Sequence, residues 1–168
     1  CQSLQQIEIP STVTSIGDNS FYSCTSLRKV VIPPSVTSIG SNAFYNCSNI
    51  KELEYDPYRI SITSIFQNYN SITNLTINTS STTLNNINIY QLSNLTHIII
   101  SSPVTTISDS AFSSCSQLQQ ITIPKSVVAI GDDAFSNCSQ LQQINIPESV
   151  ITIGDDAFYN CSQLQQIF

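Results

Sequence analysis

The sequence is poor in positive charge and in histidine. Its 168 residues include five lysines and arginines against eleven aspartates and glutamates, which gives a formal net charge of −6. Nucleic-acid-binding surfaces need clustered lysine and arginine, so this composition argues against a nucleic-acid partner. His97 is the only histidine, and we expect it at an outward strand position where no Ser/His/Asp or Cys/His set converges. We therefore expect no enzyme and no catalytic residues.

Long hydrophobic runs are also missing. No apolar stretch approaches the roughly 20 residues needed to cross a membrane, and serine, threonine, asparagine and glutamine fill most positions between the apolar residues. We expect no membrane-spanning segment in this chain. Because the sequence starts at Cys1 without a methionine and stops within a repeat, we interpret it as a piece of a longer array.

What the sequence contains instead is an internal repeat. Residues 115–137 are CSQLQQITIPKSVVAIGDDAFSN, residues 138–160 are CSQLQQINIPESVITIGDDAFYN, and Cys161 begins a further copy, so the offset is 23 residues. A fixed period of this size predicts a solenoid. We call each repeat a rung, and residues 1–168 form a single array of rungs, the third being one residue short. The rungs are 1–23, 24–46, 47–68, 69–91, 92–114, 115–137, 138–160 and a partial eighth, 161–168.

Each rung predicts a short strand followed by turns. The motif L-x-x-I-x-I-P places β-branched residues at alternate positions, which indicates a strand with one buried face, and proline should end it. A rung offers about six large apolar side chains and cannot cover them alone, so neighbouring rungs must stack. At about 4.8 Å per strand, seven rungs predict a parallel sheet roughly 30 Å wide.

Glycine is scarce and its placement is regular. All four glycines (Gly17, Gly40, Gly131 and Gly154) occupy one position of the rung, which therefore needs either a positive φ or a close backbone approach. The following D-D-A-F-x-N segment predicts one helical turn, capped by Asp132 or Asp155. These aspartate pairs could also be imagined as Ca²⁺ ligands, but no distal glutamate with suitable spacing follows. We expect no metal and no cofactor.

The six cysteines occupy another single position of the rung. They are Cys1, Cys24, Cys47, Cys115, Cys138 and Cys161. Stacked rungs hold these side chains parallel and about 4.8 Å apart, outside the usual spacing for a disulfide. Free buried thiols are the favoured interpretation. Disulfides between rungs and a metal site are the alternatives, although a ladder does not converge as zinc ligands must.

The string L-x-x-I-x-I-P-x-S-V-x-x-I-G-x-x-A-F-x-x-C resembles the BspA-like (Treponema pallidum-type) leucine-rich repeat. The match is specific in rungs one, two, six and seven, good in rung five, and weak in rungs three and four. The resemblance implies an α/β, right-handed leucine-rich-repeat solenoid, with a parallel β-sheet on one face and short helical turns on the other. It also implies a surface or secreted protein that adheres to host cells or matrix proteins.

The outward strand positions are where binding is expected. One predicted column holds Gln6, Lys29, Glu52, Asn74, His97, Gln120, Gln143 and Gln166, and the other holds Glu8, Val31, Glu54, Thr76, Ile99, Thr122 and Asn145. Rungs two to five vary and add tyrosine and arginine, which are favoured interface anchors. The candidate binding residues are Arg28, Lys29, Glu52, Glu54, Tyr55, Tyr58, Arg59 and His97. The alternative is that these rungs have simply decayed and bend the array locally.

Two functional hypotheses follow. The first is a cell-surface or extracellular adhesion and recognition module, which binds a protein or glycan of the host cell or matrix through the sheet face. The second is a structural spacer or interaction scaffold with no ligand of its own. In either case the terminal rungs should expose apolar edges, which predicts end-to-end self-association.

Overall fold

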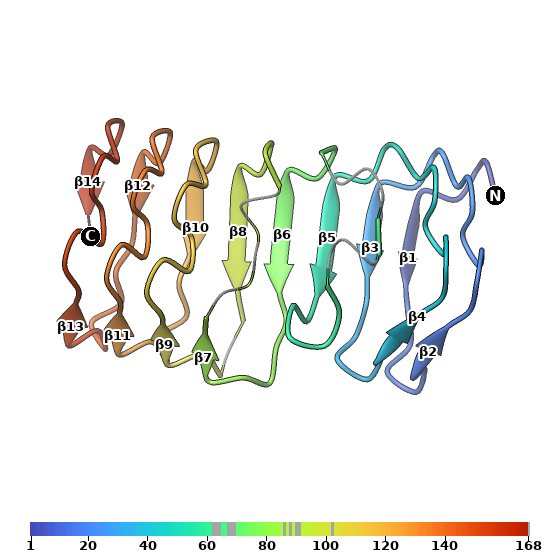
Figure 1. Cartoon of the computed structure of the whole chain (residues 1–168), viewed down its shortest axis with the longest axis horizontal. Helices are drawn as coiled ribbons and strands as arrows, with labels where there is room; N and C mark the ends of the chain where they lie inside the picture. Colours follow the sequence, from blue (N-terminus) through green and yellow to red (C-terminus); the bar gives the residue numbers. More distant parts are fainter. Residues whose placement is uncertain are drawn as a thin grey trace.

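The computed structural model describes residues 1–61, 65–66, 70–85, 87, 89, 92–101 and 103–167. It is a solenoid with one large parallel sheet of eight strands, in the order β1-β3-β5-β6-β8-β10-β12-β14. Figure 1 shows these strands side by side, one from each rung. They are β1 (Gln6–Glu8), β3 (Lys29–Val31), β5 (Glu52–Tyr55), β6 (Asn74–Ile77), β8 (His97–Ile100), β10 (Gln120–Thr122), β12 (Gln143–Ile144) and β14 (Gln166–Ile167).

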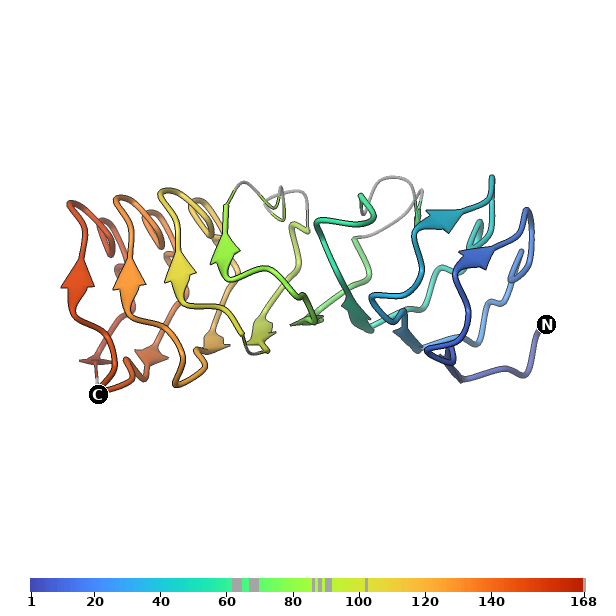
Figure 2. The same cartoon turned by 90° about the horizontal axis from the view of Figure 1, so that it is seen from below.

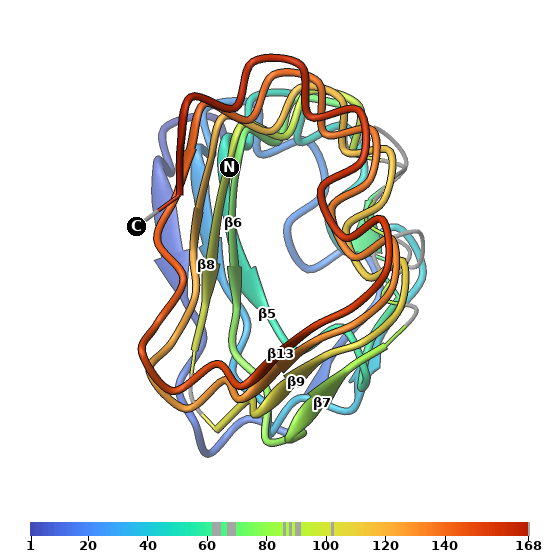
Figure 3. The same cartoon turned by 90° about the vertical axis from the view of Figure 1, so that its left-hand side faces the viewer.

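A second layer of two-residue strands forms another side of the solenoid (Figure 3). It consists of a pair, β2 (Ser15–Ile16) with β4 (Ser38–Ile39), and a four-stranded sheet of β7 (Thr83–Leu84), β9 (Thr106–Ile107), β11 (Ala129–Ile130) and β13 (Thr152–Ile153). Figure 2 shows the two groups separated along the array. Rung three, the short rung, lies between the two groups, and its described residues contribute no strand to the second layer. The second layer was not predicted from the sequence.

The strand register confirms both predicted columns of the large sheet. Gln6 pairs with Lys29, and the same 23-residue offset holds at the other steps except one. Between β5 and β6 the offset is 22, because Glu52 pairs with Asn74. The missing residue of rung three is therefore absorbed outside the strands. Asn145, the last predicted member of the second column, lies just beyond β12.

Proline sets strand length, as predicted. β1, β3 and β10 are followed closely by proline and have 3 residues each, whereas β6 and β8, which lack proline at that position, have 4. Asn78 and Ser101 stand where regular rungs have proline, and their N–H groups donate to Tyr55 and Ile77 carbonyls, both at 3.0 Å. Proline cannot make this bond, so it ends the ladder earlier.

Inward side chains of successive rungs form one continuous apolar core. Phe112 and Phe135 are fully buried. The rings of Phe112 and Phe135 stack at 5.3 Å between centroids, and Phe158 continues the stack at 5.3 Å. Viewed along the axis in Figure 3, the turns of the last rungs lie nearly over one another. Phe135 is thus covered by its copies in the rungs on both sides, as the repeat predicted.

The predicted helical turns are wrong. Over the described residues the structure has essentially no helix, and the D-D-A-F-x-N segments are hydrogen-bonded turns. In rung six the N–H groups of Asp133, Phe135 and Asn137 donate to carbonyls of the next rung, each at 2.8 Å. A helix would use these donors within the turn. Here they link the rungs, so each segment forms turns that stack on the turns of the next rung.

Two residues of each regular turn adopt a left-handed conformation. In rung six they are Asp133, with φ 54°, and Asn137, with φ 60°, and aspartate, asparagine or serine takes the same positions in other regular rungs. Asn and Asp tolerate this region better than other non-glycine residues. None of the glycines has a positive φ.

The glycine position is instead a close approach between rungs. A Cβ on Gly131 would lie less than 3.0 Å from the Asp109 N and Oδ1 atoms of the preceding rung, and Gly40 and Gly154 face Asp18 and Asp132 in the same way. Of the two explanations that the sequence allowed, a positive φ and a close backbone approach, the structure supports the close approach. Asp132 caps no helix: its Oδ1 accepts the N–H of Asp155 at 2.8 Å.

All six cysteines are free, and Cys24, Cys47, Cys115 and Cys138 are buried. The thiols of Cys47, Cys138 and Cys161 each donate to the carbonyl of the phenylalanine 26 residues earlier, at 3.1–3.2 Å. Burial raises the pKa of Cys115 from 9.0 to about 12. The buried cysteines are therefore small side chains that pack in the core with their thiols protonated.

Candidate functional site

The outer face of the large sheet presents side chains from two columns because alternate strand residues point outward. The first column passes Lys29, Glu52, Asn74 and His97 through rungs two to five. From rung six onward the same column holds only glutamine, at Gln120, Gln143 and Gln166. The face is therefore varied at one end of the array and uniform at the other.

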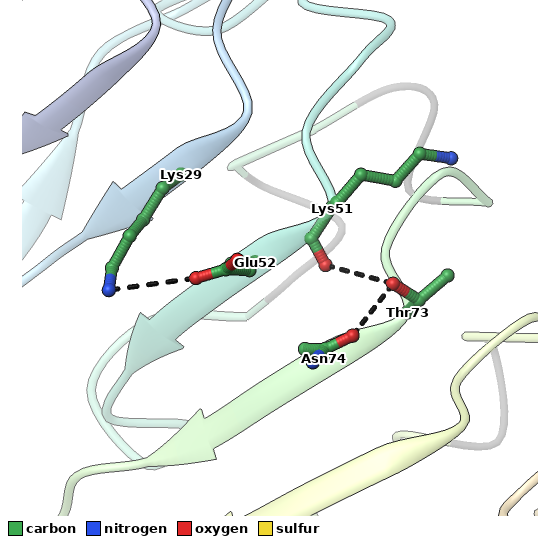
Figure 4. A network of polar contacts seen from close by, with 5 residues as sticks. All are labelled: Lys29, Lys51, Glu52, Thr73 and Asn74. Carbon is green, nitrogen blue, oxygen red and sulfur yellow. Dashed lines mark hydrogen bonds and ion pairs between the residues drawn. The ribbon is translucent and has the colours of Figure 1, made fainter.

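Charge on this face gathers in rungs two and three. Three of the five cations of the chain, Arg28, Lys29 and Lys51, lie at or next to the starts of β3 and β5, and all three are exposed. The Lys29 ammonium lies 3.6 Å from the Glu52 carboxylate, with both side chains about half exposed (Figure 4). An exposed pair of this kind contributes little stability. Its charges remain available to a partner.

Next to this pair the surface is hollowed. An open hollow of about 670 Å³ is lined in part by Gln5, Gln6, Arg28, Lys29 and Glu52. It therefore has amide, cationic and carboxylate groups in its wall. We call Arg28, Lys29, Lys51, Glu52 and Glu54 the charged patch.

The backbone under the charged patch is held by polar contacts to the next rung (Figure 4). The Thr73 hydroxyl donates to Asn74 Oδ1 at 2.8 Å and lies 3.4 Å from the Lys51 carbonyl. Glu54 accepts a hydrogen bond from the Asn78 amide at 2.7 Å. These contacts fix the strand from which the charged side chains project.

Tyr55, one of the predicted binding residues, is in the core. Its side chain is 1% exposed, and burial raises its pKa, with the Asp56 charge adding to the effect. The reason is its place in β5, since Tyr55 pairs with Ile77 on the inward-facing column. A ligand on the sheet face cannot contact it. The L-x-x-I-x-I alternation could have revealed this, because Tyr55 stands at the second isoleucine position.

Tyr58 and Arg59 are exposed but lie in the turn after β5, away from the outer column. The Tyr58 hydroxyl donates to the Thr83 carbonyl at 2.9 Å and accepts the Asn85 N–H at 2.5 Å. Arg59 Nε lies 3.6 Å from the carboxylate of the buried Asp56. Tyr58 thus joins rung three to the second layer at β7, whereas the Arg59 contact stays within rung three. They do not belong to the charged patch.

His97 begins β8 and is partly exposed. Its Nδ1 lies 2.8 Å from the Thr96 hydroxyl, and Asn74 and Gln120 flank it in the column. Nearby in the second column, Ile99 is 50% exposed. Ile99 and Lys51 were not among the predicted binding residues, and both lie on the same face as His97.

Among the residues that the structure describes, no group of three or more His, Cys, Asp or Glu side chains could hold a metal ion. Within the same part of the chain, no helix has the length and apolarity required to cross a bilayer. The outer sheet face remains the feature that offers varied chemistry.

The fold and its outer face define a parallel β-solenoid of the leucine-rich-repeat class, which is generally a non-enzymatic scaffold for protein interaction. The family model for the BspA type leucine rich repeat region matches in 6 copies, over residues 1–116 and 86–168. The chain therefore belongs to the BspA-type leucine-rich repeat family, as the sequence motif predicted. None of the curated proteins compared with it matches significantly.

Solved structures of bacterial leucine-rich repeat proteins are similar to the chain. One from Eubacterium ventriosum is 30% identical, with a TM-score of 0.54, and the match covers 94% of this chain and 37% of that one. A leucine rich cell surface protein from Faecalibacterium prausnitzii is 34% identical over 98% of this chain and 38% of its own, with a TM-score of 0.48. The T. pallidum leucine rich repeat protein is 25% identical, with a TM-score of 0.39, over 98% of this chain and 58% of its own. The chain spans well under two thirds of each.

Proposed function

We propose that the chain is an extracellular or cell-surface recognition module that binds a protein partner of the host cell or matrix through the outer sheet face of rungs two to five. The observation that carries this proposal is the charged patch. In a chain with five cations, three lie at or next to the starts of the neighbouring strands β3 and β5, and β5 also carries Glu52 and Glu54. The three cations are exposed, and an exposed ion pair such as Lys29–Glu52 contributes little to stability.

The composition of the face supports a protein partner more than a glycan. Mixed charges, the hollow beside Lys29 and the exposed Ile99 together offer ion pairing and an apolar contact. Protein interfaces combine these elements around a few dominant residues. A sugar would instead be expected to stack on exposed aromatic rings, and Tyr55 is buried. Extracellular location is proposed from the family resemblance.

The test is a matched pair of double variants. Arg28→Ala with Lys29→Ala removes two cations of the charged patch, and Gln119→Ala with Gln120→Ala changes the equivalent positions of rung six. Binding is measured by surface plasmon resonance on immobilised extracellular-matrix proteins and by adhesion to fixed epithelial cells. We expect the first variant to bind about tenfold more weakly and to lose the salt dependence of binding. The second should bind as the parent does.

Unchanged binding by the first variant would remove the charged patch from the proposal. Equal losses in both variants would place the interaction on the whole sheet face rather than on these rungs. Circular dichroism must show intact sheet in each variant. All four side chains are exposed, so folding should not suffer.

The spacer function remains the second candidate, favoured by the regularity of rungs six and seven. Their outer columns hold glutamine, threonine and asparagine, and their backbones are linked on both sides by rung-to-rung hydrogen bonds. Such rungs extend an array without offering a distinctive surface. Absence of binding to every matrix protein and cell type tested would favour this function over recognition.

A further inference from the structure

A further hollow opens on the outer face of the large sheet, where β8, β10 and β12 lie side by side (Figure 1). It measures about 180 Å³, and the described residues that line it are His97, Gln119, Gln120, Gln142 and Gln143. β6 and β14 continue the sheet on the two sides of these strands. The wall of the hollow thus combines one imidazole with four primary amides.

The imidazole of His97 is linked to rung four by two hydrogen bonds in series. The Thr96 hydroxyl donates to the Thr73 carbonyl at 3.0 Å, and the same hydroxyl oxygen lies 2.8 Å from His97 Nδ1. A hydroxyl has one proton and a carbonyl has none, so Nδ1 must supply the proton of the shorter contact. In the neutral ring Nε2 is therefore unprotonated. It is the ring nitrogen left to contact a partner.

A proton on Nε2 would place an unpaired positive charge beside this hollow. Histidine side chains change charge between pH 5 and 8. The strands packed against β8 present neutral outward groups to His97, namely Asn74 and Thr76 of β6 and Gln120 and Thr122 of β10. Among the described strands of the large sheet, the nearest one with charged outward residues is β5, with Glu52 and Glu54.

We propose that this hollow binds a carboxylate of the protein partner when His97 is protonated. The Nε2–H of the imidazolium donates to the carboxylate, and the amide groups of Gln120 and Gln143 provide further N–H donors. Hydrogen bonds between charged groups are about twice as strong as those between neutral groups. Above the pH at which His97 loses this proton, Nε2 presents a lone pair to the carboxylate and the contact is lost.

The outer face then has two positive sites, the charged patch in rungs two and three and His97 in rung five. Glu52 and Glu54 lie on β5, between Lys29 on β3 and His97 on β8. A polymer with negative charge along its whole length, such as a sulfated polysaccharide, would be repelled by them. The face therefore fits a protein segment whose acidic side chains are spaced apart. This description of the partner rests on the proposed recognition function.

The test is an NMR titration of the 15N-labelled 168-residue chain with a short acidic peptide, acetyl-Glu-Gly-Glu-amide, at pH 5.5 and pH 7.5. The glutamates of the peptide stay ionised at both pH values. At pH 5.5 the peptide should shift the side-chain amide signals of Gln120 and Gln143 and bind there at least fivefold more tightly than at pH 7.5. The neutral peptide acetyl-Gln-Gly-Gln-amide is the matched probe and should shift these signals at neither pH.

Variants separate the charge of His97 from the shape of the surface. His97→Gln keeps a polar side chain without the charge, so the pH dependence of binding at Gln120 should disappear. Ser38→Ala, an exposed change on β4 of the second layer, should bind as the parent does. His97 is partly exposed, so its replacement should leave the sheet intact, as checked by circular dichroism.

Thr96 is a positioning residue, and its role has a readout of its own. At pH 7.5 the 15N signals of the His97 ring should show the proton on Nδ1 in the parent and in Thr96→Ser, which keeps the hydroxyl. Thr96→Val should show a mixture of the two tautomers and bind the acidic peptide several-fold more weakly at pH 5.5. A parent ring with its proton on Nε2 would contradict the hydrogen-bond series.

Three results would overturn the proposal: equal affinity at Gln120 at both pH values, tighter binding at pH 7.5, or an unchanged pH dependence in His97→Gln. The experiment uses no matrix protein or cell, so its outcome is separate from that of the proposed function. Signals of Arg28 and Lys29 report the charged patch in the same titration. Shifts there at both pH values, without shifts at Gln120, would leave the patch as a binding surface and exclude the hollow.

Discussion

The Asp132 carboxylate accepts a hydrogen bond from the backbone N–H of Asp155, one rung further along, at 2.8 Å. The same contact joins Asp109 to Asp132 at 3.0 Å and Asp18 to Ser41 at 2.6 Å. Since the receiving group is a backbone amide, the residue that follows need not be aspartate, as Ser41 shows. The aspartate therefore recurs because it links neighbouring turns, and the glycine before it recurs because it leaves room for that link.

Removal of this acceptor should weaken the array. Asp132→Ala leaves the Asp155 N–H without its carboxylate, and we expect a loss of about 1 kcal/mol in the free energy of unfolding, measured in urea. Asp132→Asn keeps an oxygen acceptor and should lose less. Equal losses in the two variants would assign the effect to the charge rather than to the hydrogen bond.

Filling the space at the interior glycine should be more harmful. Gly131→Ala places a Cβ less than 3.0 Å from the Asp109 N atom and the Ser108 carbonyl carbon, which are backbone atoms and cannot rotate away. We expect a loss of about 1–3 kcal/mol, as for other overpacked sites. Thermal unfolding of Gly131→Ala and of Gly17→Ala, where a Cβ would meet only Ser20 Oγ at 3.5 Å, provides the comparison, and similar losses in both would contradict the steric explanation.

The aromatic stack should show how burial depends on neighbours. Phe135 is covered by Phe112 on one side and Phe158 on the other, whereas Phe158 has a stacking partner on one side and is only partly buried. Phe135→Ala should therefore cost about 3–5 kcal/mol, and Phe158→Ala clearly less. Urea unfolding of both variants decides this. A larger loss for Phe158→Ala would mean that the rungs do not share their cores as described.

The thiols should differ in reactivity. Cys1 is exposed, Cys161 is partly buried and the remaining four are buried. Titration of the native chain with a thiol-reactive dye should label Cys1 quickly and Cys161 more slowly, and the other four only after unfolding. Mass spectrometry of the labelled peptides identifies each site. Fast labelling of Cys115 or Cys138 would contradict their burial.

Stability should fall at alkaline pH. Burial raises the pKa of Cys115 from 9.0 to about 12, so the folded state holds a proton that the unfolded state releases. The stabilisation is complete below pH about 9 and is lost as pH rises toward about 12. Urea midpoints measured under reducing conditions at pH 8 and 10.5 should therefore differ more for the parent than for Cys115→Ala. Cys1→Ala, at an exposed site, should change nothing.

Much of the fold could be predicted because each rung repeats the same pattern of apolar, proline and glycine residues. The columns of the large sheet were predicted residue by residue, since a constant offset and strand alternation leave one register. The helical turns were predicted wrongly from the same segments. The sequence Asp-Asp-Ala-Phe is compatible with a capped helical turn. It forms stacked turns instead because its N–H groups donate to carbonyls of the next rung, such as those of Asp155 and Ala157.

The candidate site could be predicted less well. Lys29, Glu52, Glu54 and His97 lie on the outer face as the alternation indicated. Tyr58 and Arg59 lie in the turn after β5, where Tyr58 contacts the second layer and Arg59 pairs with Asp56. Tyr55 was assigned to the surface by its residue type, although its strand position indicated the core. Composition suggests which residues favour interfaces, but the direction of each side chain follows from the backbone on which it lies.

The sequence by itself determined the period, the stacking of the rungs and the identity of the residues that repeat, because each apolar set can be buried only by its copies. It left open why one position must be glycine and what the aspartates do. The tertiary structure decided both, through the distance between Gly131 and Asp109 and the bond from Asp155 to Asp132. These are contacts between residues about one rung apart, and their geometry exists only once the rungs are stacked.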